Sequence, residues 1–158
     1  MKYFKVLVLA LALLAPQFAI AQTSARANRA WKPFFTTVRA AVKNRDKNAL
    51  MKLMSRDFYY LSSGGDENGN HDTRDEAFEY WTTGEVGSWD ALDKALAAGA
   101  VVNTAMREPD NLRPGRVAPP QANDKTAITN RAFPWYAVFE FRNNRWYFTG
   151  FTECCDQQ

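Results

Sequence analysis

Residues 135–152 read WYAVFEFRNNRWYFTGFT, two runs of aromatic and β-branched residues around an Asn-Asn pair. Asparagine tolerates the positive φ angles that a two-residue hairpin turn requires, so this stretch predicts a C-terminal β-hairpin. If the strands pair without interruption across Asn143 and Asn144, four aromatic side chains share one face: Phe139, Phe141, Trp146 and Phe148. This apolar face should lie against helices.

The opposite face of the predicted hairpin is half polar. The same regular register places Glu140 opposite Tyr147 and Val138 opposite Thr149. A face of this composition should meet solvent, a ligand or a partner protein. Candidate binding residues are the aromatic side chains that have no evident partner on the inward face: Tyr59, Tyr136, Tyr147 and Phe151.

Helices are predicted upstream of the hairpin. Apolar residues recur at three- and four-residue steps from Trp31 to Val42, which is typical of an amphipathic helix. The small and polar residues 22–30 before it predict a frayed lead-in. Asp46 can cap a second, shorter helix, and residues 58–61 predict a strand.

The middle of the chain alternates loops and short elements. Residues 64–70 are rich in turn-forming residues and predict a loop. A capping box at residues 73–76 opens a helix. Ser88 caps the next helix, which Gly99 ends, and residues 100–106 predict a strand.

Residues 107–125 contain four prolines and show no hydrophobic periodicity. Loops of this length are uncommon in compact domains and are usually functional or mobile. We therefore expect a functional or mobile loop here. Its three arginines, Arg107, Arg113 and Arg116, could meet an acidic ligand or the acidic residues between residues 66 and 93, and Arg113 and Arg116 are candidate binding residues.

The first 21 residues have the three-part layout of a secretory signal peptide. Lys2 and Lys5 form a basic start, residues 6–15 are apolar, and residues 19–21 are a small-x-small cleavage signal. The expected organisation is a signal peptide at 1–21 and a single α+β domain at 22–158, placed in the periplasm or secreted. After cleavage we expect a soluble product with no membrane contact, because no second apolar run follows.

Charge is unevenly distributed along the chain. Residues 22–57 carry nine Lys or Arg and two Asp, whereas residues 66–93 carry nine Asp or Glu and one Arg. These regions could face each other, pair two molecules into a homodimer, or be two solvated helix faces. Nucleic acid is not an expected partner, because the basic residues lie on a helix with few stacking aromatic side chains.

No motif assigns a catalytic residue, a metal site or a cofactor. His71 is the single histidine, and a surface or helix-capping role is the simplest reading. The spacing of Asp66, Asn68 and Asn70 resembles a calcium loop, but the glycine and glutamate that such a loop requires are missing. The region is either a solvated acidic loop or a weak calcium site formed by four carboxylates: Asp66, Glu67, Asp72 and Asp75. The adjacent Cys154 and Cys155 could form a strained disulfide, bridge two chains or remain free thiols.

The order of predicted elements, together with residues 40–46, 54–58 and 139–148, resembles the nuclear-transport-factor-2-like superfamily, in particular its small secreted bacterial members. The resemblance implies an α+β fold in which N-terminal helices pack on a curved antiparallel, cone-like sheet that ends in a hairpin. It also implies a pocket between helices and sheet. Two consecutive helices after the acidic loop, and prolines where a long central strand is expected, depart from the pattern. The fold hosts enzymes, binders and dimerisation modules, so it implies no single activity.

Three functions are compatible with these observations. The first is non-catalytic binding of a small apolar ligand or a protein partner. The second is a small enzyme of the same fold that uses a pocket carboxylate or His71. The third is a structural helper that dimerises through the outer face of the sheet.

Overall fold

The computed structural model describes residues 2–62, 74–83, 88–104, 113–124 and 135–153. Side chains of residues 2–22, 61–62, 77, 80–83 and 88 are outside this description. The elements in chain order are α1 (Lys2–Lys43), α2 (Lys47–Leu53), β1 (Met54–Ser62), α3 (Arg74–Thr83), α4 (Ser88–Ala97), β2 (Val101–Val102), β3 (Gly115–Ala118), the 3-10 turn η1 (Pro120–Asn123), β4 (Trp135–Arg142) and β5 (Arg145–Glu153).

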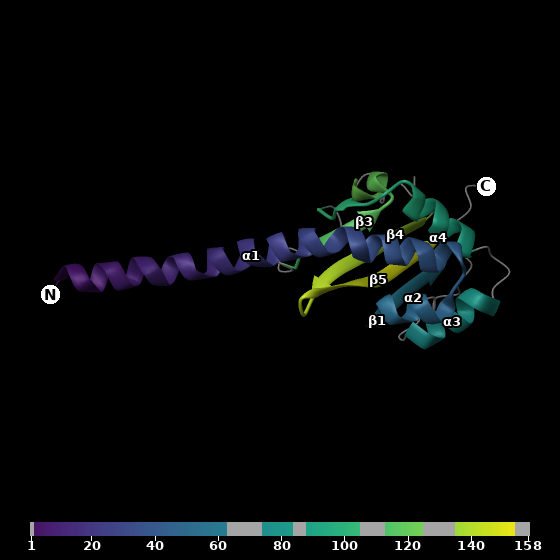
Figure 1. Ribbon diagram of the computed structural model, residues 1–158, viewed down its shortest axis with the longest axis horizontal. Helices are drawn as coiled ribbons and strands as arrows, with labels where there is room; N and C mark the ends of the chain where they lie inside the picture. Colours follow the sequence, from purple (N-terminus) through teal and green to yellow (C-terminus); the bar gives the residue numbers. More distant parts are fainter. Residues whose placement is uncertain (1, 63–73, 84–87, 105–112, 125–134, 154–158) are drawn as a thin grey trace.

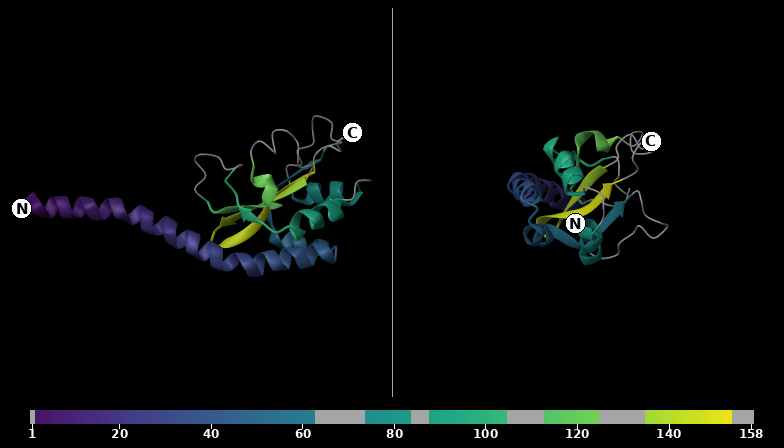
Figure 2. Two further views of the ribbon diagram at one scale, coloured as in Figure 1. Left: turned by 90° about the horizontal axis from the view of Figure 1, so that it is seen from above. Right: turned by 90° about the vertical axis from the view of Figure 1, so that its right-hand side faces the viewer.

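The strands form one five-stranded sheet in the order β1-β5-β4-β3-β2. Helices α1 and α4 cover one face of it, and Figure 2 shows α1 running along this side. We call this the inner face. The α+β arrangement of N-terminal helices on a sheet with a terminal hairpin is confirmed. The sheet is mixed, not antiparallel throughout, because β1 pairs with β5 in parallel. A parallel neighbour needs a long crossover, here supplied by every element between the two strands.

The predicted hairpin is present, and its turn residues Asn143 and Asn144 have positive φ angles of 51° and 63°. The regular register is confirmed from Arg142 opposite Arg145 to Phe139 opposite Phe148. The predicted pairing of Val138 with Thr149 is wrong, because a β-bulge shifts Val138 opposite Gly150. A bulge adds one residue to one strand, so the side chains beyond it exchange faces.

Helix α1 is continuous through the segment predicted to be frayed. Ala27 is fully buried, and Trp146 Nε1 donates a hydrogen bond to its carbonyl oxygen at 2.8 Å. The small residues of this segment let the helix approach the bulky indole of β5. Figure 1 shows that the first part of α1 extends away from the sheet. Among the residues that the structure describes, no helix is long and apolar enough to cross a membrane.

The second helix begins where its cap was predicted. The side chain of Asp46 accepts a hydrogen bond from Ala49 N at 3.0 Å. Strand β1 begins at Met54, earlier than the predicted start at residue 58. The predicted strand at 100–106 is only two residues long in β2. Gly99 ends α4 with a φ of 86°, which glycine adopts without strain.

The proline-rich segment 107–125 was expected to be a loop, and this is wrong for its described part, residues 113–124. Strand β3 pairs with β4 inside the sheet, and Val117 and Ala118 are fully buried. The turn η1 follows directly and buries Ala122. Pro114 and Pro119 flank β3, and neither occupies a position inside the strand, where a missing N–H would interrupt the ladder.

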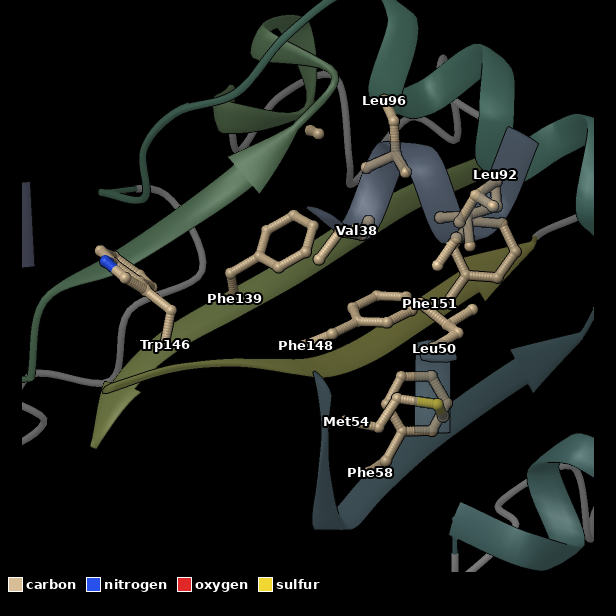
Figure 3. Packing of buried hydrophobic residues seen from close by; sticks show 14 of the residues in the cluster. Val38, Leu50, Met54, Phe58, Leu92, Leu96, Phe139, Trp146, Phe148 and Phe151 are labelled. Atoms are coloured by element: carbon tan, nitrogen blue, oxygen red, sulfur yellow. The ribbon is translucent and has the colours of Figure 1, made fainter. Parts of the chain in front are cut away.

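The core lies between the helices and the inner face of the sheet. The four aromatic side chains predicted for this face are buried. Trp31 of α1 contacts Phe139 and Trp146 edge-on, with ring centroids 5.3 and 4.7 Å apart. Figure 3 shows Val38 of α1 pointing toward the strand that carries Phe139. Aromatic side chains of α1, β4 and β5 therefore pack together in this part of the core.

Candidate functional site

Three of the predicted binding residues lie on the outer face of the sheet, opposite the helices. Tyr59 pairs with Gly150, Tyr136 with Thr152 and Tyr147 with Glu140. The ring of Tyr59 lies so close over Gly150 that a β-carbon there would overlap it.

The hydroxyl of Tyr59 titrates above its ordinary range. Burial raises the pKa of Tyr59, and the nearby Tyr136 and Glu140 raise it further, although 39% of the residue is exposed. The two tyrosines and Glu140 therefore lie close together on the outer face.

Phe151 was expected on the same side as these tyrosines, and this is wrong. It is fully buried on the inner face, where it stacks on Tyr60 with ring centroids 5.9 Å apart. The physical reason is the bulge in β5, which exchanges the faces of the residues after Thr149. Phe151 is a core residue.

Of the three arginines of the predicted loop, Arg107 lies outside the described residues, and Arg113 and Arg116 lie on different faces. Arg116 is on the inner side, where its guanidinium lies 4.9 Å from the centre of the Trp31 ring and donates to Asn28 Oδ1 at 3.1 Å. Burial lowers the pKa of Arg116. Arg113 is exposed and lies 3.9 Å from Glu140. They do not form a common site, and Arg116 is a packing residue.

A pocket of about 460 Å³ opens between the start of β1 and the tip of the β4–β5 hairpin. We call it the basic pocket, because five cations and one carboxylate line it. Its lining residues are Lys52, Met54, Ser55, Arg56, Asp57, Arg74, Arg142, Asn143, Arg145 and Tyr147. Tyr147 is the predicted binding residue that the structure places in it.

Irregular pairing of β1 shapes this pocket. Met54 pairs with Phe148, and the next paired residue, Tyr59, lies opposite Gly150. Residues 55–58 therefore have only Thr149 opposite them and depart from the regular ladder. Bulges of this kind change the direction in which side chains point and are frequent beside functional sites.

Arg142 is the innermost cation and is held by two carboxylates. Its Nη1 donates to Asp57 Oδ2 at 2.6 Å, and its Nε donates to Glu140 Oε2 at 2.6 Å. Burial alone would raise the pKa of Asp57, but the hydrogen bond and charge of Arg142 outweigh it and hold the pKa below 3.8. Burial alone would lower the pKa of Arg142, but the two carboxylates raise it. Both groups stay charged at neutral pH.

Three other cations of the pocket are not neutralised. In the described part of the chain, no ion pair involves Lys52, Arg56 or Arg145. Arg145 lies with its guanidinium 4.2 Å from the centre of the Tyr147 ring and directly opposite Arg142 in the hairpin. Like charges opposite each other destabilise a sheet pair. This arrangement favours a site that receives negative charge.

The pocket is also lined by Ser55, whose buried hydroxyl is poorly aligned for hydrogen bonding. Ser55 is 3% exposed, and its Oγ has no hydrogen-bond partner within accepted geometry among the described residues. The hydroxyl is nevertheless near enough to Asp57 to help lower the pKa of that carboxyl. Ser55 therefore places a buried, poorly aligned hydroxyl beside the carboxylate that Arg142 binds.

Sequence reasoning missed every residue of the basic pocket except Tyr147. Two signals were present: the excess of basic residues in 22–57, and the arginines that flank the Asn-Asn turn. Neither signal shows that Arg56 and Arg145 lie in one pocket, because the parallel pairing of β1 with β5 brings them together.

Several other predictions fall outside the described residues. His71, the loop at 64–70, and Cys154 with Cys155 belong to this group. Within the described ranges, no group of three or more His, Cys, Asp or Glu is placed to hold a metal ion. A second pocket, of about 270 Å³, lies along α1 beside Asp93 of α4 and is lined by both apolar and charged residues.

Comparisons with known proteins leave the function open. No family model matches the chain, and no curated protein matches it. Among solved structures, the chain is similar to the crystal structure of LinA with 10% sequence identity and a TM-score of 0.42, covering 87% of this chain and 90% of that chain. This is a general similarity of fold.

Proposed function

We propose that this chain is an exported, non-catalytic binding domain whose ligand carries an anionic group held in the basic pocket. The observation that carries the proposal is five cations against one lining carboxylate, with Lys52, Arg56 and Arg145 in no ion pair among the described residues. Guanidinium groups bind carboxylates and phosphates through paired, charge-assisted hydrogen bonds. A concentration of such groups in one concave site supports anion binding.

The pocket favours an anionic ligand over the apolar ligand expected from the sequence. Met54 and Tyr147 supply limited apolar surface, and charged side chains supply most of the remaining lining. A small apolar molecule would displace water from these charged groups without replacing their hydrogen bonds. A protein partner with an acidic segment fits the same chemistry.

The electrostatics of Asp57 support binding over catalysis. A general base works best when its pKa lies near the working pH. Arg142 holds the pKa of Asp57 below 3.8, so this carboxylate is a weak base at neutral pH. An enzyme that uses the carboxylate of this pocket is therefore the weaker alternative.

The structure also gives less support to the third function, a structural helper that dimerises through the outer face of the sheet. Among the described residues, the exposed large hydrophobic side chains are Tyr59 and Val102. They lie on β1 and β2, which are the two opposite edges of the sheet. Two separated side chains do not make the continuous apolar patch that marks a protein interface.

Charge reversal in the pocket tests the proposal. Arg56→Glu should weaken the binding of inorganic phosphate by about ten-fold or more, because it removes one attraction and adds one repulsion. The matched control is Arg29→Glu, an exposed arginine on α1 outside the pocket lining. Titration calorimetry at pH 8 and fixed ionic strength gives both affinities. Equal losses in the two variants would show that phosphate responds only to overall charge.

The proposed export leads to a separate prediction, which concerns the first residue of the mature protein. When the full chain is produced in a bacterium, the product outside the cytoplasm should begin at Gln22, because residues 19–21 form the cleavage signal. Intact mass spectrometry of the fractionated protein measures this start. Replacing Leu13 and Leu14 by arginine should keep the uncleaved chain in the cytoplasm. An extracytoplasmic product that retains Met1 would contradict the prediction.

A further inference from the structure

Arg142 already binds a carboxylate of the chain itself, the side chain of Asp57. Its Nη1 donates to both carboxylate oxygens of Asp57, at 2.9 and 2.6 Å. The Asp57 side chain is 65% exposed, whereas the side chains of Arg142 and Glu140 are 24% and 19% exposed. Asp57 can therefore turn toward solvent while the less exposed pair of Arg142 and Glu140 stays in place.

Ser55 lies beside the same position. The residue lines the basic pocket, and its buried hydroxyl lowers the pKa of Asp57 together with Arg142. The carboxylate of Asp57 thus occupies a position that offers one guanidinium and one hydroxyl donor, and it is poorly aligned with the hydroxyl. A ligand oxygen at this position would accept from Ser55 in better alignment.

We propose that the ligand carries a phosphomonoester group, which takes the place of the Asp57 carboxylate on Arg142 and accepts a hydrogen bond from Ser55. The inference rests on the proposed function, which assigns the pocket to anions without naming their class. Lys52, Arg56 and Arg145 then balance the second charge of the phosphate at the mouth of the pocket.

A ligand must displace the Asp57 carboxylate from Arg142, and this competition favours a phosphomonoester over a carboxylate. Asp57 is tethered to the site and acts at a high effective concentration. A ligand carboxylate offers the same two oxygens and the same single charge, so it gains little by displacing Asp57. A phosphomonoester carries nearly two charges at neutral pH and three terminal oxygens, which can engage Arg142, Ser55 and an outer cation together. A sulfate ester has the same shape with a single charge.

The ligand class is tested with three small probes on the purified protein at pH 8 and fixed ionic strength. Titration calorimetry should show methyl phosphate binding about ten-fold more tightly than methyl sulfate, with acetate weaker than both. Methyl sulfate or acetate binding as tightly as methyl phosphate would overturn the inference and leave the proposed function standing. If none of the three probes binds, both fail.

The two residue roles are tested by substitution. Ser55→Ala should weaken methyl phosphate binding by about ten-fold while changing the melting temperature little, because the hydroxyl makes no well-aligned hydrogen bond with a described residue in the free protein. Asp57→Ala should strengthen binding by about ten-fold, because it removes the tethered competitor. Asp75→Ala is the matched control, since Asp75 is an exposed carboxylate near Arg74 that does not line the pocket.

Each variant can contradict the inference. Unchanged affinity in Ser55→Ala would remove Ser55 from the site. An affinity in Asp57→Ala that is unchanged, or that rises no more than in Asp75→Ala, would show that Asp57 is not displaced. Measured melting temperatures separate these outcomes from loss of folding.

The phosphomonoester can belong to a soluble molecule or to a lipid headgroup. Glycerol 3-phosphate tests the first source by calorimetry. Cosedimentation with vesicles that contain phosphatidic acid tests the second, with phosphatidylglycerol vesicles as the phosphodiester control. Binding to glycerol 3-phosphate, or to phosphatidic acid in preference to phosphatidylglycerol, supports the proposed class and names its source. Equal binding to the two kinds of vesicle contradicts it.

Discussion

Trp146→Ala should lower the free energy of unfolding by about 3–5 kcal/mol, the range for truncating a large aromatic side chain in a core. Trp146 is 4% exposed, and its ring lies 4.7 Å from Trp31 and 5.6 Å from Phe141. Its Nε1 also donates to the carbonyl oxygen of Ala27. The substitution therefore removes the contact that joins the start of the packed part of α1 to the hairpin.

Two companion variants separate the contributions at this position. Trp146→Phe keeps most of the ring contact and loses the hydrogen bond, so it should lower the free energy of unfolding by about 1–2 kcal/mol. Tyr147→Ala truncates a partly exposed side chain on the outer face and should have clearly less effect than Trp146→Ala. Urea unfolding followed by circular dichroism measures all three. Equal losses for Trp146→Ala and Tyr147→Ala would mean that the two faces of the hairpin are assigned incorrectly.

The hairpin is predictable from sequence because its determinants are local. The Asn-Asn turn, the alternation of side chains and the length of the two strands all lie within residues 135–153. The cap of α2 is local for the same reason, since Asp46 and Ala49 are three residues apart. Propensity and periodicity describe such elements well.

The segments that sequence reasoning misplaced depend on distant partners. Residues 22–30 have no apolar stripe of their own, and Ala27 is buried because Trp146 covers it. Strand β3 is four residues long, too short to show alternation, and it is held by pairing with β4. In both cases tertiary contacts determine a structure for which the local sequence shows no preference.

The basic pocket could not be predicted for a related reason. Its cations come from α2, β1, α3, β4 and β5, and no two of these segments share a motif. The sequence shows an excess of basic residues in 22–57, which is compatible with an ordinary solvated helix face. The parallel contact of β1 with β5, together with the irregular pairing of residues 55–58, gathers these charges around one position.

The pocket combines features that a fold selected for stability alone would avoid. Arg142 and Arg145 face each other across the hairpin, and the buried hydroxyl of Ser55 makes no well-aligned hydrogen bond with a described residue. Asp57 and Glu140 relieve the repulsion at Arg142 only. Local departures from stable packing are characteristic of functional sites. An anion in this pocket would relieve both, which connects the energetics of the free protein to the proposed ligand.

A second substitution with a large expected effect is at Phe151, because the bulge in β5 determines which face of the sheet this residue occupies. Phe151→Ala should lower the free energy of unfolding by about 3–5 kcal/mol, since the ring is fully buried, stacks on Tyr60 and lies opposite Ala137. Tyr136→Ala is the control, because Tyr136 is a partly exposed aromatic residue on the outer face of the adjacent strand. Its loss should be less than half as large in the same urea measurements. A ladder without the bulge would place Phe151 on the outer face. A small loss for Phe151→Ala, no greater than that for Tyr136→Ala, would therefore show that the strand keeps the regular register.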